Sequence, residues 1–194
     1  MHNKVLILFA HPALEKSRIN KPMADAVKNQ EHVTFRDLYE EYPDFNIRVP
    51  DEQELLILHE IIVFQHPFYW YSCPSLLKEW LDLTLQYNFA YGNKGNALEG
   101  KKLLSVITTG AIKEAYQQDG FHGCEMREFL LPFIQTARLC RMQYLPPYII
   151  HGTHLMQSKE VIAECAEDYK KLIIELTSGE IDFEGLEAKS YWNE

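Results

Sequence analysis

Short apolar runs that alternate with amphipathic segments constrain the fold of this 194-residue chain more than any other feature. The clearest run is Ile61–Phe64, four apolar residues of β character, and a helical stripe of leucine and tryptophan begins after Pro74. A short, continuous apolar run predicts a strand that is covered on both faces. The sequence therefore predicts a parallel sheet between two layers of helices.

Five segments predict strands, at 4–10, 32–37, 61–66, 102–108 and 143–150. The segment at 32–37 alternates and fits a strand nearer the sheet edge. Helices are predicted between and after these strands, at about 17–29, 51–60, 74–87, 124–140 and 158–177. Pro146 and Pro147 indicate an edge or a bulge in the last strand. Three features favour a flavodoxin-like α/β fold: right-handed crossovers, the number of five strands, and the absence of G-x-G-x-x-G after the first strand. Its strand order is 2-1-3-4-5, with helices on both faces.

Length and composition fit a single domain at 1–194, with a core at 1–180 and a peripheral carboxyl-terminal tail at 181–194. The net charge of −9 argues against binding to nucleic acid or directly to anionic lipid. No apolar stretch reaches the roughly 20 residues that span a bilayer, and no signal-peptide pattern is present. We therefore expect a cytoplasmic protein that reaches the inner membrane only through a protein partner.

The four cysteines are widely spaced and predict free thiols in a reducing compartment. His151 and His154 have loose metal-ligand spacing, but no cysteine or carboxylate follows at metal-site intervals. The G-x-S-x-G pattern of a hydrolase nucleophile is also absent. The sequence thus predicts neither a metal site nor acyl-transfer chemistry.

In the predicted strand order, a ligand crevice opens where the first and third strands end. The loop from His11 to Asn20 leads into a helix and carries a hydroxyl, a cation and an amide, which suits a phosphate group. The alternative is an ordinary helix cap by Ser17 with solvated neighbours. His11 is equally suited to donating to a phosphate and to closing a turn.

Four consecutive aromatic residues, Phe68–Tyr71, follow the third predicted strand. Neither helical nor strand periodicity would bury all four, so they predict a stacking surface for a planar ligand. The alternative is that Phe68 and Trp70 complete the core while the two tyrosines lie at the surface.

The loop after the fourth predicted strand begins with Thr108, Thr109 and Gly110, and a glycine there lets the backbone approach a ligand closely. Tyr116 and His122, farther along the loop, are a donor pair that could stabilise negative charge on a bound ring. The alternative for each is a role confined to hydrogen bonds within the loop.

Together these residues resemble the flavodoxin-like NAD(P)H:quinone oxidoreductases, and most closely the ancillary oxidoreductases of the bacterial Kef glutathione-regulated potassium-efflux systems. The resemblance covers about residues 5–172. It is carried by AHP at 10–12 with Ser17 and Asn20, DLY at 37–39, YPDFNI at 42–47, QHPFYWYSCPSLLKEWLD at 65–82, FAYG at 89–92 and ITTG at 107–110.

The resemblance implies FMN, held without a covalent bond. The implied FMN-binding residues are His11, Ser17, Arg18, Ile19, Asn20, Pro67, Phe68, Tyr69, Trp70, Tyr71, Thr108, Thr109, Gly110 and Ala111. Tyr116 and His122 match a catalytic pair that offsets negative charge on the reduced flavin. Tyr91 matches an aromatic residue that reaches the neighbouring subunit's site in a homodimer. Ala111 stands where the family usually has a second glycine, which restricts the backbone beside the ring.

The implied activity is that of an NAD(P)H dehydrogenase (quinone), which passes a hydride from NAD(P)H through FMN to a quinone. The implied partner is a Kef-type potassium-efflux membrane protein. One alternative is a regulatory subunit that activates the antiporter, with turnover incidental. Another is a small flavodoxin-type electron carrier, which would not require Tyr116 and His122.

Overall fold

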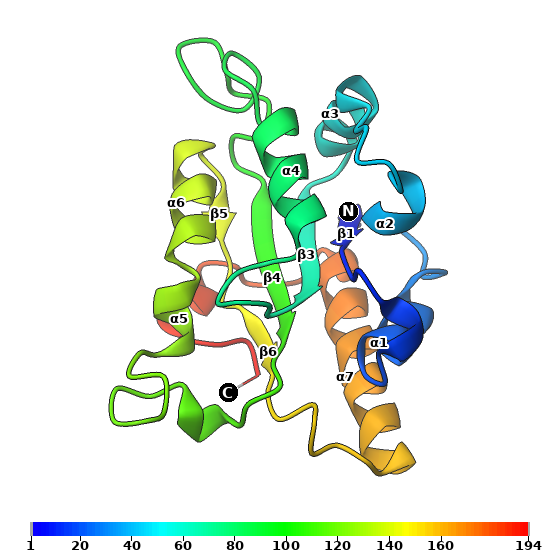
Figure 1. Cartoon of the computed structure of the whole chain (residues 1–194). Coiled ribbons are helices and arrows are strands. Elements are labelled where there is room, and N and C mark those ends of the chain that lie inside the picture. Colours follow the sequence, from blue (N-terminus) through cyan, green and yellow to red (C-terminus); the bar gives the residue numbers. More distant parts are fainter. Residues whose placement is uncertain (1, 194) are drawn as a thin grey trace.

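A parallel sheet lies in the middle of the molecule, and helices cover both of its faces (Figure 1). The computed structural model describes residues 2–193. Its strands are β1 (Val5–Phe9), β2 (Val33–Asp37), β3 (Ile61–Pro67), β4 (Lys102–Thr108), β5 (Gln143–Tyr144) and β6 (Tyr148–Ile150). The order β2-β1-β3-β4-β5 confirms the predicted flavodoxin-like order, and β6 is an additional strand that pairs with β4.

The last predicted strand is divided in two. Strand β5 pairs with the beginning of β4 and strand β6 with its end, so the prediction of one continuous strand at 143–150 is wrong. The division falls at Pro146 and Pro147, which have no N–H to donate to a neighbouring strand. The two prolines thus lie at the sheet edge, where the sequence predicted an irregularity.

Seven α-helices connect the strands or follow them in the described part of the chain. They are α1 (Asn20–Val27), α2 (Leu38–Glu41), α3 (Val49–Leu58), α4 (Ser75–Thr84), α5 (Met126–Phe129), α6 (Leu131–Leu139) and α7 (Lys159–Ser178). Three 3₁₀ segments, η1 (Leu14–Lys16), η2 (Lys113–Ala115) and η3 (Gly185–Ala188), lie outside them.

Two helical predictions need correction. The single helix expected at 124–140 is two helices, α5 and α6, because Pro132 lies in the first turn of α6 and cannot continue the hydrogen bonding of α5. The short helix α2 was not predicted. The carboxylate of Asp37, at the end of β2, accepts a hydrogen bond from the Tyr39 N–H (3.0 Å) and caps this helix.

Each face of the sheet has its own apolar core. Leu6 and Leu8 of β1 face the side on which Trp80 of α4 is buried, together with residues of α2, α3, α5 and α6. Val5 and Ile7 of β1 face the other side, which α1 and α7 cover. Because every residue of β1 is buried, this strand is central, as its continuous apolar sequence predicts. No helix among residues 2–193 is long and apolar enough to cross a membrane.

Candidate functional site

Three loops meet at the carboxyl ends of β1, β3 and β4, and together with the loop after β6 they surround a cavity of about 380 Å³. Small-molecule sites commonly have volumes of about 300–1,000 Å³. The three loops come from the segments that the sequence singled out for a ligand. Ten of the predicted cofactor residues line this cavity: His11, Ser17, Arg18, Ile19, Asn20, Pro67, Phe68, Tyr69, Thr108 and Gly110. We call it the crevice.

One wall of the crevice is a set of polar groups around Asn20. The Asn20 side-chain amide donates to the hydroxyls of Thr108 (2.9 Å) and Ser17 (3.3 Å), which joins the first loop to the end of β4. The Asn20 side-chain oxygen is buried and has no partner among the described residues. A buried acceptor without a donor costs free energy. The crevice therefore offers an acceptor that suits a hydroxyl group of a ligand.

The helix predicted to begin at Ser17 begins at Asn20. The Ser17 hydroxyl accepts a hydrogen bond from the Asn20 N–H (3.0 Å), so Ser17 acts as a cap from outside the helix. The start of α1, together with the cations Lys16 and Arg18 in the same crevice, gives this end a positive potential. That potential suits a phosphate group.

His11 lies under the crevice and is nearly buried. Its Nδ1 accepts a hydrogen bond from the Ala13 N–H (3.2 Å), so a neutral His11 carries its proton on Nε2. Burial lowers the pKa of His11, which favours this neutral form. His11 thus closes a turn through one nitrogen and can donate through the other.

The aromatic segment divides between the crevice and the surface. Phe68 and Tyr69 line the crevice, whereas Trp70 and Tyr71 do not. Trp70 and Tyr71 have positive φ angles (49° and 61°), and the Ser72 N–H donates to the Tyr69 carbonyl (3.0 Å). These features describe a tight turn with two left-handed central residues, which projects Trp70 outward with 93% of its surface exposed. Trp70 therefore does not complete the core, contrary to one of the two alternatives.

The turn after β4 brings the backbone close to a second loop. At Gly110, an added Cβ would lie 2.5 Å from the imidazole of His154, so only glycine fits without displacing that ring. Thr109 is buried beneath the turn, and neither Thr109 nor Ala111 lines the crevice. Ala111 is not among the described residues with positive φ, so its methyl group adds no backbone strain.

Tyr116 and His122 lie together but outside the crevice. Their rings stack with centroids 4.5 Å apart, and His122 Nε2 is buried without a partner among the described residues. Phe68, which lines the crevice, contacts the Tyr116 ring edge to face at 5.9 Å. Burial raises the pKa of Tyr116. The pair therefore lies one aromatic ring behind the crevice.

Sequence reasoning missed four crevice residues: Ala13, Lys16, Thr153 and His154. The last two come from the loop after β6, where the spacing of His151 and His154 was weighed only for a metal. No group of three or more His, Cys, Asp or Glu side chains within residues 2–193 is arranged to hold a metal ion.

Tyr91 lies away from the crevice, in a cavity of about 470 Å³ that α4 and α6 border. Its ring packs against that of Tyr87 (5.7 Å between centroids) and against the core on the α4 side of the sheet.

Comparison with known proteins places the chain among proteins of one fold. The sequence profile of a family with a flavodoxin-like fold matches residues 3–173. The chain is 48% identical over 166 residues to the glutathione-regulated potassium-efflux system ancillary protein KefG of Erwinia tasmaniensis, which covers 86% of this chain and 90% of the relative.

Two solved structures are also similar. General stress protein 14 of Treponema denticola, in complex with FMN, is 39% identical with a TM-score of 0.84, covering 89% of this chain and 99% of that one. An NADPH-quinone reductase of P. pentosaceus is 32% identical with a TM-score of 0.78, and the match covers 87% of this chain and 96% of that one.

Proposed function

Because the chain belongs to the family with a flavodoxin-like fold, we propose that it is an FMN-dependent oxidoreductase that transfers a hydride from NAD(P)H to a quinone. The observation that carries the proposal is the crevice, which gathers a phosphate-binding end, an unpaired buried acceptor and an aromatic wall. The FMN in the similar protein of Treponema denticola and the name of the similar NADPH-quinone reductase support it.

Each part of the crevice suits one part of FMN. The start of α1, with Ser17, Lys16 and Arg18, suits the phosphate. The unpaired oxygen of Asn20 suits a hydroxyl of the ribityl chain. The aromatic wall at Phe68 and the glycine backbone opposite suit the flat ring system.

FMN, when bound, supplies the capacity to accept and return a hydride. The residues of the chain hold and orient the reactants, and they balance charge. The Tyr116 hydroxyl and a ring N–H of His122 are the donors that would stabilise negative charge, and the buried, unpaired Nε2 of His122 is available for this role. Phe68 and Tyr69 would exclude water from one side of the crevice.

The first test is an absorbance spectrum of the purified protein, followed by titration with FMN. We expect a flavin band, or its appearance on adding FMN, and a rise in unfolding temperature that depends on FMN concentration. Bleaching of the flavin by NAD(P)H, and its return on adding a quinone, would support the activity. A colourless protein that gains neither a flavin band nor thermal stability would refute the proposal.

We further propose that the protein is a homodimer. Trp70 (93% exposed) and Phe121 (89%) are large apolar side chains at the surface beside the site. Tyr71 and Phe121 both contact the His122 ring, so these exposed residues surround one catalytic candidate. A second copy covering them would bury apolar surface and close the site. Sedimentation should give twice the chain mass, and Trp70→Ser should shift the equilibrium toward the monomer.

A regulatory role is the second candidate, because a relative that is 48% identical has the name of a potassium-efflux ancillary protein. In this role the protein would lie on the cytoplasmic side of the inner membrane, bound to a potassium-efflux membrane protein. Co-purification of such a membrane protein with the tagged chain would support it. Potassium efflux that is unchanged on deleting the chain would count against it.

A further inference from the structure

The turn after β4 is fastened to the loop after β6. The Thr109 N–H donates to the Ile150 carbonyl (2.8 Å), and the Gly152 N–H donates to the Ala111 carbonyl (2.8 Å). The N–H and the hydroxyl of Thr153 both donate to the Thr109 carbonyl (3.0 Å each). Four hydrogen bonds therefore hold these loops together.

His151 lies at the centre of this junction. Its Nδ1 is 3.2 Å from the hydroxyl oxygen of Thr109. The hydroxyl proton of Thr109 is directed to the Ala111 carbonyl (2.8 Å), so the Thr109 oxygen acts as acceptor and His151 Nδ1 as donor. Burial and the nearby Lys113 ammonium lower the pKa of His151 to about 4, so the ring is neutral near pH 7. The single ring proton is therefore on Nδ1.

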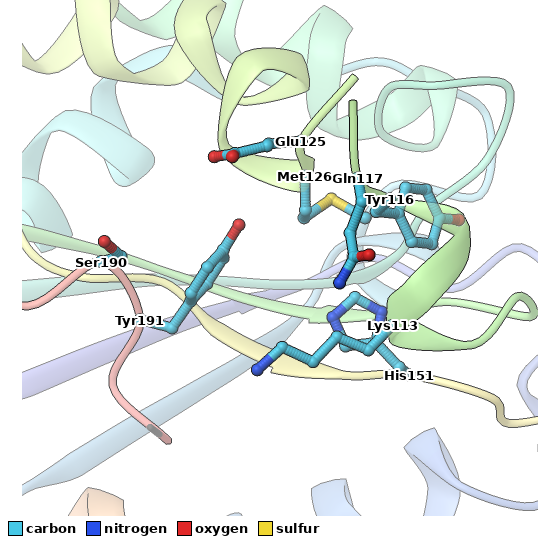
Figure 2. A pocket seen from close by; sticks show the side chains of 8 residues that line it. All are labelled: Lys113, Tyr116, Gln117, Glu125, Met126, His151, Ser190 and Tyr191. Carbon is cyan, nitrogen blue, oxygen red and sulfur yellow. The ribbon is translucent and has the colours of Figure 1, made fainter. Parts of the chain in front are cut away.

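Two imidazoles pack against the Tyr116 ring. The His151 ring has its centroid 5.4 Å from that of Tyr116 and its plane at 41°, and the His122 ring stacks on Tyr116 with centroids 4.5 Å apart. Figure 2 shows Tyr116 and His151 among the residues that line a second cavity, which has a volume of about 250 Å³. This second cavity is distinct from the crevice.

Residues 192–193 are hydrogen-bonded to the segment just before His151. The Asn193 side chain donates to the Ile149 carbonyl (2.8 Å) and accepts from the Ile149 N–H (3.3 Å), in the manner of a neighbouring strand. The Trp192 N–H donates to the Pro147 carbonyl (3.0 Å). Tyr191 and Trp192 pack on opposite faces of the sheet, so this segment covers the edge of β6 (Figure 1). It lies beyond residues 3–173, which the family profile matches.

We propose that His151 is a positioning residue for Tyr116. Its Nδ1–H holds the Thr109 hydroxyl, and its ring supports one side of the tyrosine, so that the phenol keeps one orientation behind the crevice. The catalytic consequence rests on the proposed function of Tyr116, whereas the positioning itself does not. A displacement of about 1 Å in such a group can slow a reaction up to a hundredfold.

Two substitutions test the hydrogen bond, because both remove the ring and only one of them places a donor at the position of Nδ1. In His151→Asn, the amide N–H can take the place of Nδ1–H and reach Thr109. In His151→Gln, the longer side chain carries its amide to the position of Nε2 and lacks the donor at Nδ1. Thr109→Val removes the acceptor while preserving the shape of the side chain, and Thr109→Ser retains it.

The first measurement needs no cofactor. In protein labelled with ¹³C at tyrosine Cζ, the Tyr116 signal is assigned by its absence in Tyr116→Phe and is followed with pH. We expect the Tyr116 shift and titration to change less in His151→Asn than in His151→Gln, and less in Thr109→Ser than in Thr109→Val. If all four variants leave the Tyr116 signal unchanged, or if Asn and Gln change it equally, the proposal is wrong.

The second measurement is the rate of flavin reduction by NAD(P)H in protein loaded with FMN. We expect a loss of about tenfold in His151→Gln and Thr109→Val, and a smaller loss in His151→Asn. Absence of flavin reduction in the wild-type protein would refute the proposed function. The Tyr116 signal would still show whether His151 positions Tyr116. Equal rates in the Asn and Gln variants would overturn the positioning role.

Discussion

The imidazole of His122 stacks on the phenol of Tyr116 with ring centroids 4.5 Å apart and planes 23° from parallel. Because Tyr71 also contacts the His122 ring, at 5.5 Å, the imidazole is held between two tyrosines. Its Nε2 is buried without a partner in the described chain, which is unusual for a polar atom that has only a structural role.

We expect His122→Ala to slow flavin reduction by NAD(P)H by roughly 10- to 100-fold, because one donor to developing negative charge is lost. FMN should remain bound, since His122 does not line the crevice. Stopped-flow bleaching of the flavin measures the rate, and His2→Ala, on the opposite end of β1, is the control. An unchanged bleaching rate would exclude His122 from the chemistry.

Arg18→Gln is expected to weaken FMN binding by about fivefold, equivalent to about 1 kcal/mol, because a cation leaves the phosphate end of the crevice. Riboflavin lacks the phosphate, so its affinity should not change. Added salt should also reduce the difference between variant and wild type. Quenching of flavin fluorescence measures both affinities, with the exposed Arg138→Gln of α6 as the control. An equal loss for riboflavin would show that Arg18 acts on something other than the phosphate.

The sheet was predictable because each strand is indicated by the pattern of its own consecutive residues. The central strands are short apolar runs and β2 alternates, and handedness and strand number then leave few possible strand orders. The crevice followed from the strand order, since parallel strands bring their carboxyl ends to one edge of the sheet.

The junction around His151 was not predictable in the same way. His151 and Thr109 are 42 residues apart, and their contact depends on the path of β6 beside β4. No local pattern marks that path. The outward turn at Trp70 and Tyr71 was also missed, because aromatic residues rarely adopt the positive φ that this turn requires. A sequence motif therefore indicated which loops form the site, but not which side chains point into it.

Asp37 should make the stability of the protein depend on pH. Burial raises the pKa of its carboxyl from 3.8 to about 6, so the folded chain keeps this proton at pH values where the unfolded chain has lost it. The free energy of unfolding should therefore fall as the pH rises from about 4 to about 6, by up to about 3 kcal/mol.

Asp37→Asn keeps the cap on α2 and removes this titration. We expect the variant to be more stable than wild type at pH 7 and similar to it near pH 4. Urea unfolding at several pH values tests this, with the exposed Asp44→Asn as the control. Parallel pH profiles for wild type and Asp37→Asn would show that Asp37 is not the responsible group.

Glu52 holds a buried polar network that joins α3 to α4 and β2. Its carboxylate is inaccessible to solvent and accepts hydrogen bonds from Arg36, from the Tyr42 hydroxyl (2.6 Å) and from the Trp80 indole N–H (2.8 Å). We expect Glu52→Gln to lower the free energy of unfolding by roughly 3 kcal/mol, because the guanidinium loses its buried counter-charge. Urea unfolding measures this value.

The exposed Glu54→Gln on the same helix is the matched control and should change stability by less than about 0.5 kcal/mol. The double variant Glu52→Gln/Arg36→Met is more informative, since it removes both charges. In Glu52→Gln the guanidinium keeps only its ion pair with the partly exposed Glu41 (3.1 Å). If the cost of the single substitution comes from the loss of the buried counter-charge, the double variant should be more stable than the single one. A double variant whose loss equals the sum of the two single losses would show that Glu52 and Arg36 stabilise the fold independently.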